Sequence, residues 1–146
     1  MGKNVLAAWW PVPLRVIVGY GFMAHGIAKL LRGVGAFASV LHALGVPFPS
    51  AMAPATIAIE LAGGAAVLLG AWVRVAAVPL AIVMIVAAVS VHLPYGFSSI
   101  KLVQVTATGP RFGPPGYELN LLYLACLLAL SAGGSGPLSI RKEKGR

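Results

Sequence analysis

Acidic residues are scarce in this chain of 146 residues, which has only three Asp and Glu side chains against 11 Lys and Arg. All charged residues together make up 10% of the sequence, whereas a soluble domain has about 25%. Hydrophobic residues make up 59%, and the mean hydropathy is +0.91. A soluble domain is thereby excluded, and we expect one integral membrane domain over residues 1–146.

Cysteine is nearly absent as well, because Cys126 is the only one in the chain. An intramolecular disulfide, a CxxC redox pair and thiol–disulfide exchange between two thiols of one chain are therefore excluded. Cys126 lies in the middle of an apolar run, where a small thiol side chain usually serves packing.

Four apolar segments are long enough to cross a hydrocarbon layer of about 30 Å, which takes about 20 helical residues. They cover residues 12–31, 52–71, 73–93 and 117–133. The predicted fold class is all-α, an integral membrane four-helix bundle with antiparallel spans. The second and third spans are separated by very few residues (GAWVRVA), which predicts a tight hairpin with a short cytoplasmic connection.

The distribution of the positive charges indicates how the spans are oriented. Four spans place both termini on one side, and that side has seven Lys and Arg residues against four on the other. The positive-inside rule therefore predicts cytoplasmic termini, with residues 134–146 as a basic cytoplasmic tail near anionic headgroups. Since the charges are scattered between apolar runs, they do not indicate a nucleic-acid partner.

The connection between the third and fourth spans, PYGFSSIKLVQVTATGPRFGPPG, is long and rich in Pro and Gly. Loops of this length often cover a functional site. An ordinary surface loop is the alternative interpretation.

Ionisable residues interrupt or end all four predicted spans. His25 and Lys29 lie one turn apart in the first, Glu60 lies within the second, His92 ends the third and Glu118 begins the fourth. A charge at mid-bilayer costs roughly 2.5–3.5 kcal/mol, so such residues usually face the bundle interior and pair. At about 1.5 Å per residue, all five fall in the outer half of the bundle, which predicts one polar site.

One interpretation of this cluster is purely structural. Glu60 then neutralises Lys29 or His25, Glu118 pairs with His92, and the network sets the helix register. A lysine near a helix end also reaches the headgroups readily, and the same is expected of Arg15 and Arg74 near the cytoplasmic ends. Small residues such as Gly64 on the face of Glu60 let the helices approach closely.

A metal site is a second interpretation, because imidazole and carboxylate groups suit Zn, Cu or Fe. The ligands would be His25, Glu60, His92 and Glu118. No compact ligand spacing such as HExxH is present, so no metal is assigned. A haem held by His25 and His92 is less well supported still, because there are only two candidate ligands and His92 lies near the surface.

A quinone site is the third interpretation. A reduced quinone needs a base to take its protons and hydrogen-bonding groups to hold its oxygens, and a His–Glu pair suits that task. His25 and Glu60 are the predicted proton-handling pair. Lys29, His92 and Glu118 are predicted to contact the head group, and further hydrogen bonds are expected from Tyr20 and Tyr123.

Several segments together resemble one family. They are RVIVGYGFMAHGIAKL, IELAGGAAVLLGAWVRVAA, HLPYGF and GYELNLLYLACLLAL followed by GPLSI, between about residues 15 and 140. Their order and spacing resemble the DoxX family of small bacterial and archaeal membrane proteins. The resemblance implies a four-helix membrane protein in a bacterial or archaeal plasma membrane. The positions matching the family pattern are His25, Lys29, Glu60, Gly63, Gly64, Arg74, His92 and Glu118. Structural roles are expected for Arg15, Gly63, Gly64 and Arg74.

The function implied by this resemblance is a subunit or anchor of a membrane oxidoreductase complex with a quinone-facing polar site. Relatives of the DoxD type are associated with a thiosulfate:quinone oxidoreductase. Since the chain has no soluble redox domain, a soluble or membrane partner would supply the flavin, metal or thiol, and this chain would be a non-catalytic or quinone-interacting subunit. The alternative is a non-enzymatic scaffold or a transporter-like protein that binds a small solute or metal. Exposed Ala and Gly faces also permit a homo-oligomer.

Overall fold

The structure, a computed structural model, describes residues 8–141 and consists mainly of helices. In chain order the elements are α1 (Pro11–Arg32), α2 (Val34–Ala43), α3 (Pro49–Ala58), the π-helical turn η2 (Ile59–Gly63), α4 (Gly64–Leu69), α5 (Val73–Ala87), the π-helical turn η3 (Ala88–His92), the 3₁₀ turn η4 (Leu93–Tyr95), β1 (Leu102–Thr106), β2 (Gly109–Phe112) and α6 (Glu118–Gly133). Helices therefore occupy each of the four ranges predicted as spans.

Among the described residues, three continuous helical rods are long and apolar enough to cross a membrane. They are Pro11–Arg32, Pro49–Leu69 and Val73–Tyr95. The 16 residues of α6 make a shorter apolar helix. The outward faces of the rods and of α6 are apolar too, since Ile17 and Val78 of the rods are 59% and 61% exposed and Leu128 of α6 is 71% exposed. Helices that are hydrophobic all round are typical of membrane spans, so the structure agrees with a membrane protein.

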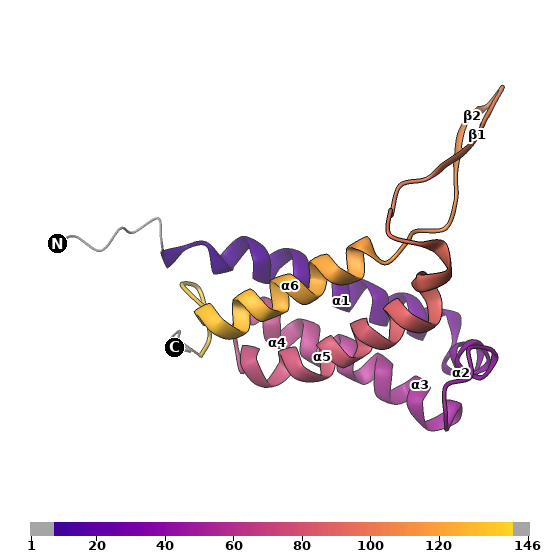
Figure 1. Cartoon of the computed structure of the whole chain (residues 1–146). Coiled ribbons are helices and arrows are strands. Elements are labelled where there is room, and N and C mark those ends of the chain that lie inside the picture. The colour runs from indigo at the N-terminus through magenta and orange to yellow at the C-terminus, as the bar shows by residue number, and fades with distance from the viewer. Residues whose placement is uncertain (1–7, 142–146) are drawn as a thin grey trace.

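Figure 1 shows the helical rods lying alongside one another, with α2 across one end and the β1–β2 hairpin projecting from that same end. The start of α1, the turn between α4 and α5, and the end of α6 gather at the opposite end. We refer to these as the hairpin end and the turn end. α1 packs against η2 and α4, and α6 packs against α5 and α1.

Glycines let α1 and α4 pack with their backbones in contact. A Cβ atom on Gly19 would lie 2.7 Å from the Gly64 carbonyl oxygen, and one on Gly64 would lie 2.8 Å from the Gly19 carbonyl oxygen. In lipid, close packing of this kind is a main source of helix association. Gly63 similarly faces α5, where an added Cβ would lie 3.0 Å from the Leu80 side chain.

The short connection predicted between the second and third spans is a tight turn. Gly70 has a left-handed φ of 68°, its N–H donates to the Val67 carbonyl, and the next N–H, of Ala71, donates to the Ala66 carbonyl. This is the Schellman pattern, in which glycine ends a helix at little conformational cost. The chain reverses within three residues, and α5 begins at Val73.

Two connections differ from the prediction. Residues between the first two spans form α2, and the long Pro- and Gly-rich connection contains the β1–β2 hairpin, so the chain is not purely α-helical. Residues 134–141, the start of the predicted basic tail, pack at the turn end: the Ile140 N–H donates to the Leu69 carbonyl over 3.0 Å, and Ser135 is fully buried. The rest of the predicted tail, residues 142–146, lies outside the described residues.

Candidate functional site

An ion pair between Lys29 and Glu60 forms the centre of the candidate site. Lys29 Nζ donates a hydrogen bond to Glu60 Oε1, which joins α1 to η2. The Glu60 side chain is 2% exposed and that of Lys29 is 25% exposed. The Lys29 ammonium also lies 5.1 Å from the centre of the Phe37 ring of α2, a cation–π distance. The pair therefore lies toward the hairpin end, where α2 covers it.

Local backbone geometry directs Glu60 into the interior. Glu60 lies in η2, a single π-helical turn between two α-helical segments, and such turns often occur at functional sites. Gly26 of α1 faces it: a Cβ atom there would lie 3.3 Å from Glu60 Cβ and 2.9 Å from the Leu61 side chain. The glycine thus leaves room for a carboxylate between two spans.

Two buried side-chain atoms have no hydrogen-bond partner within residues 8–141. They are Glu60 Oε2 and Asn120 Oδ1. Buried polar groups in folded proteins are nearly always hydrogen-bonded, so each exception calls for an explanation. Both atoms are acceptors when Glu60 is ionised, so both lack a donor.

Asn120 lies in the first turns of α6 and is 4% exposed. Its Nδ2 atom is 3.5 Å from both the carbonyl oxygen and the Sδ atom of Met84 in α5. Gly63 faces Leu80 across two antiparallel helices. One turn nearer the hairpin end, Glu60 precedes Gly63 by three residues and Met84 follows Leu80 by four, so Glu60 and Met84 lie at the same level. The two unpartnered atoms therefore occur at a similar depth in the hairpin half.

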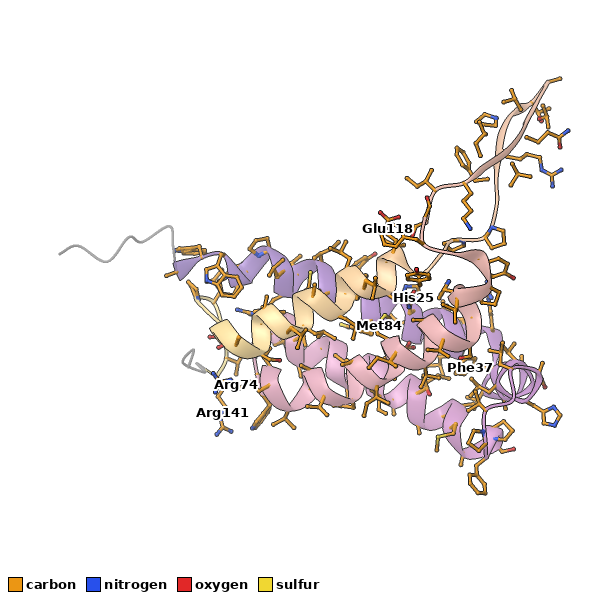
Figure 2. All side chains as sticks on the ribbon, viewed as in Figure 1. His25, Phe37, Arg74, Met84, Glu118 and Arg141 are labelled. Carbon is orange, nitrogen blue, oxygen red and sulfur yellow. The ribbon has the colours of Figure 1, made fainter. Side chains whose placement is uncertain are left out.

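His25 is exposed, and within the described residues it has no hydrogen bond or ion pair. Figure 2 shows His25, Met84 and Glu118 in the half of the molecule toward the hairpin end. The structure therefore shows Lys29, and not His25, as the group bonded to Glu60. Whether His25 handles protons stays a prediction.

His92 and Glu118 bind the loop that carries the hairpin. Glu118 Oε2 accepts a hydrogen bond of 2.9 Å from the Ser99 backbone N–H. The Pro115 carbonyl lies 3.0 Å from His92 Nδ1, which donates to it. The alternative of a direct Glu118–His92 pair does not occur. Their predicted contact with a ligand stays a prediction.

The two tyrosines lie in different surroundings. Tyr20 is 66% exposed on the outer face of α1. Tyr123 packs edge-on against Phe22, with ring centres 5.3 Å apart and an interplanar angle of 89°. Its hydroxyl occupies the space beside Gly21, where an added Cβ would be only 1.9 Å from the oxygen. Of these two tyrosines, Tyr123 therefore packs between helices and Tyr20 does not.

Arg15 occupies the turn end and is 3% exposed. The expectation that it extends to the headgroups was wrong, because its guanidinium donates five hydrogen bonds to backbone carbonyls inside the fold. The acceptors are Val67 (3.2 Å), Ser135 (2.7 Å), Pro137 (2.8 Å), Leu68 (2.9 Å) and Leu138 (2.9 Å). Arg74 likewise donates from Nε to the Ser131 carbonyl at the end of α6, over 2.8 Å.

The four ligands considered for a metal do not come together. Within residues 8–141, no group of three or more His, Cys, Asp or Glu side chains is close enough to hold an ion. Glu60 is occupied with Lys29, while His92 and Glu118 bind the hairpin loop. The polar site that the structure does assemble is the Lys29–Glu60 pair with its unpartnered oxygen.

Comparison with known proteins gives a family match. A model of the DoxX family matches residues 11–93, which run from the start of α1 to the end of the helical rod that begins at Val73. This range contains the Lys29–Glu60 pair, His25 and His92, but neither Glu118 nor Asn120. No curated protein and no solved structure matches the chain.

Proposed function

The chain belongs to the DoxX family, since the family model matches residues 11–93 of its 146 residues, and we propose a function from this premise. The protein is a four-helix membrane subunit or anchor of an oxidoreductase complex. Its ligand is a quinone head group bound near Glu60 in the hairpin half. We place it in the plasma membrane with cytoplasmic termini, on the count of positive charges. Its partner is a soluble or membrane redox protein, and a second copy of the chain is compatible with the exposed small-residue faces.

One observation carries the proposal: Glu60 is buried, and only one of its two carboxylate oxygens has a partner. Leaving a buried acceptor unsatisfied costs about 1–3 kcal/mol, and more for a charged group. A ligand hydroxyl that donates to Glu60 Oε2 would remove this penalty. The Lys29 ammonium, meanwhile, donates to the other oxygen, Oε1, so Oε2 is the atom left for a ligand.

The chemistry of the unpartnered atoms supports the reduced form of the ligand. Glu60 Oε2 and Asn120 Oδ1 both accept hydrogen bonds. A quinol has hydroxyl groups that donate, whereas the oxidised quinone has only carbonyl acceptors. Asn120 thus joins the proposed site, although the sequence analysis did not single it out.

Proton and electron transfer are divided between two proteins in this proposal. A quinol that is oxidised releases two protons and two electrons, and the reverse reaction takes them up. Glu60 takes up or returns the two protons one after the other at Oε2, and His25 on the exposed face of α1 exchanges each of them with the surroundings. The electrons pass to or from a flavin, metal or thiol group of the partner, because Cys126 cannot form a disulfide within the chain.

A scaffold without a ligand is the second candidate function. The Lys29–Glu60 pair joins α1 to η2, and the contact of Lys29 with Phe37 extends this link to α2. These contacts alone would hold the hairpin half together. Under this hypothesis the unpartnered oxygens serve no ligand.

Binding of a short-chain quinol to the purified protein in lipid nanodiscs tests the proposal. Parent protein is expected to bind the quinol more tightly than the matching quinone. Glu60→Gln keeps the shape of the side chain. With the amide oxygen facing Lys29, an NH2 donor replaces the acceptor Oε2, so we expect binding of the quinol to fall at least tenfold. Glu143→Gln, the same chemical change in the tail, is the matched control and should bind as the parent does.

Two further results decide between the candidates. Native mass spectrometry of protein released from its own membranes gives the first result. A quinone mass that copurifies with the parent protein, and is lost with Glu60→Gln, supports the quinone site. Equal binding by parent and Glu60→Gln protein, with no copurifying quinone, contradicts it and leaves the scaffold.

A further inference from the structure

The β1–β2 hairpin has one apolar and one polar face. Cross-strand pairs are Leu102 with Phe112, Gln104 with Arg111, Val105 with Pro110 and Thr106 with Gly109. Paired side chains lie on the same face and successive ones alternate, while the bulge between Leu102 and Gln104 shifts the alternation by one. One face therefore carries only apolar side chains, and the paired polar side chains lie on the other. Val103, the extra residue of the bulge, has no cross-strand partner and is 71% exposed. The apolar face consists of Leu102, Val105, Pro110 and Phe112.

This apolar face is uncovered within the described part of the chain. Leu102 and Phe112 are each 59% exposed, Val105 is 71% exposed, and the nearby Ile100 is 78% exposed. A two-stranded hairpin is at best marginally stable in water by itself. Contiguous exposed apolar groups of this kind mark an interaction surface.

The base of the hairpin is fixed to the ends of the helices. The Gly116 N–H donates to the Ser98 carbonyl over 3.0 Å, and the Glu118 N–H donates to the Phe97 carbonyl over 3.0 Å. Gly116 is required for this closure, because an added Cβ would lie 2.0 Å from the Gly96 carbonyl oxygen. The hairpin is therefore held where the third helical rod ends and α6 begins, at the level of a bilayer boundary.

Aromatic residues mark the same level. Phe97 and Tyr117 pack edge-on at the hairpin base, with ring centres 5.7 Å apart, and Tyr95 ends the third rod with 42% exposure. Aromatic side chains with one polar end favour the interface between lipid and water. Figure 1 shows the hairpin leaving this level obliquely instead of continuing along the helix axes.

The charge of the segment is of one sign. Residues 96–117 contain two cations, Lys101 and Arg111, and no acidic residue. Arg111 lies on the polar face of the hairpin, opposite the apolar one. A basic polar face behind an apolar face is the pattern of elements that lie in the membrane interface.

We propose that the β1–β2 hairpin lies on the bilayer surface, with its apolar face in the headgroup–acyl boundary and Lys101 and Arg111 beside anionic lipid headgroups. The bilayer is the occupant that the charge and the position at the ends of the spans favour. The hairpin then acts as a membrane contact in addition to the spans. This role does not depend on the quinone site, since no residue of the Lys29–Glu60 pair takes part.

Spin labels placed on the two faces test the proposal. Cys126→Ser removes the only native thiol, and Val105→Cys and Gln104→Cys then place labels on the apolar and polar faces. Collision with oxygen, which concentrates in lipid, is compared with collision with a water-soluble nickel chelate. In vesicles of phosphatidylcholine with phosphatidylglycerol, the oxygen-to-nickel ratio should be several-fold higher at position 105 than at position 104. As a control, the Cys126→Ser protein should unfold with the same free energy as the unsubstituted protein, which shows that this substitution leaves the fold intact.

Each other outcome overturns the proposal in a recognisable way. Free access of the nickel chelate to both positions means that the hairpin stands in water. Shielding of position 105 from both reagents means that a protein or a second copy covers the face. Replacing Lys101 and Arg111 by Gln, or omitting phosphatidylglycerol, should lower the ratio at position 105 toward that at position 104, and an unchanged ratio contradicts the role given to the charges.

Discussion

Arg15 and Glu60 are the two buried charged side chains of residues 8–141, and their surroundings differ in one decisive respect. At the turn end, all five N–H donors of Arg15 have carbonyl acceptors. Toward the hairpin end, Glu60 has one bonded oxygen and one unpartnered oxygen. A complete set of partners is what a structural charge needs, whereas an incomplete set leaves capacity for a ligand or a proton.

The two sites also differ in what they connect. Arg15 joins α1 to the end of α4 and to the chain that follows α6, and the carbonyls it binds include helix-terminal groups that have no partner within their helix. Lys29 and Glu60 join α1 to η2 by one ion pair, and Lys29 adds a cation–π contact to Phe37 of α2. We therefore expect the turn end to be rigid and the site in the hairpin half to tolerate substitution better. The predictions below test this contrast, in order of decreasing effect.

Arg15→Gln should have the largest effect on stability. Several backbone carbonyls would lose their donor in a water-poor interior, and we expect the free energy of unfolding to fall by about 3–5 kcal/mol. Unfolding in detergent, followed by circular dichroism, measures this. Arg15→Lys keeps the charge but not the planar fork of donors, so it should recover only part of the loss. A change below about 1 kcal/mol for Arg15→Gln would show that the carbonyl cluster is not a structural centre.

Lys29→Met should have a smaller effect, because this pair is partly exposed through Lys29. The variant leaves the Glu60 carboxylate buried without a counter-charge, and we expect a loss of about 2 kcal/mol. Adding Glu60→Gln removes the stranded charge and should restore most of the stability. If the double variant is no more stable than Lys29→Met alone, the two residues are not energetically coupled.

Gly64→Ala tests the α1–α4 contact that both sites share. The added Cβ would lie 2.8 Å from the Gly19 carbonyl oxygen, so the helices must separate, and we expect a loss of about 1–3 kcal/mol. Gly35→Ala is the matched control, since a Cβ there has open space in an exposed part of α2 and alanine favours the helix. Equal effects of the two changes would indicate that the close approach carries no packing energy.

Asn120→Leu should have the smallest effect on stability, and of opposite sign. It removes the unpartnered Oδ1 from the interior, so we expect the free energy of unfolding to rise by up to about 1 kcal/mol while quinol binding weakens. Paired measurements of unfolding and quinol binding check both parts. A variant that is more stable and binds quinol as the parent does would remove Asn120 from the site.

The positions of the long helices were predictable because hydropathy alone determines them. The predicted ranges 12–31 and 73–93 correspond closely to the observed rods Pro11–Arg32 and Val73–Tyr95. The β1–β2 hairpin was missed, because the alternation in LVQVT is brief and lies among Pro and Gly residues that are typical of loops. Its amphipathic character depends on a bulge, which only the strand pairing reveals.

The candidate site was only partly predictable. The buried position of Glu60 and its partnership with Lys29 were among the alternatives considered, while Asn120 was overlooked, although a lone polar residue in the apolar run NLLYLACLLAL is a usable signal. The direct contact of Glu118 with the hairpin loop was not foreseen. Such contacts join residues that are distant in the sequence or lie in irregular segments, where residue spacing carries no information on partners.

The sequence by itself determined that the chain has helices of membrane-spanning length and which of them carry charged groups, because long apolar runs and their interruptions are local properties. Only the tertiary structure decided which of these charges have complete sets of partners. The faces of these helices are apolar toward lipid and toward one another, so hydropathy does not specify how each helix is rotated against its neighbours. Close packing at Gly19, Gly26 and Gly64 sets that rotation, and it leaves Arg15 fully bonded and Glu60 with one oxygen unpartnered.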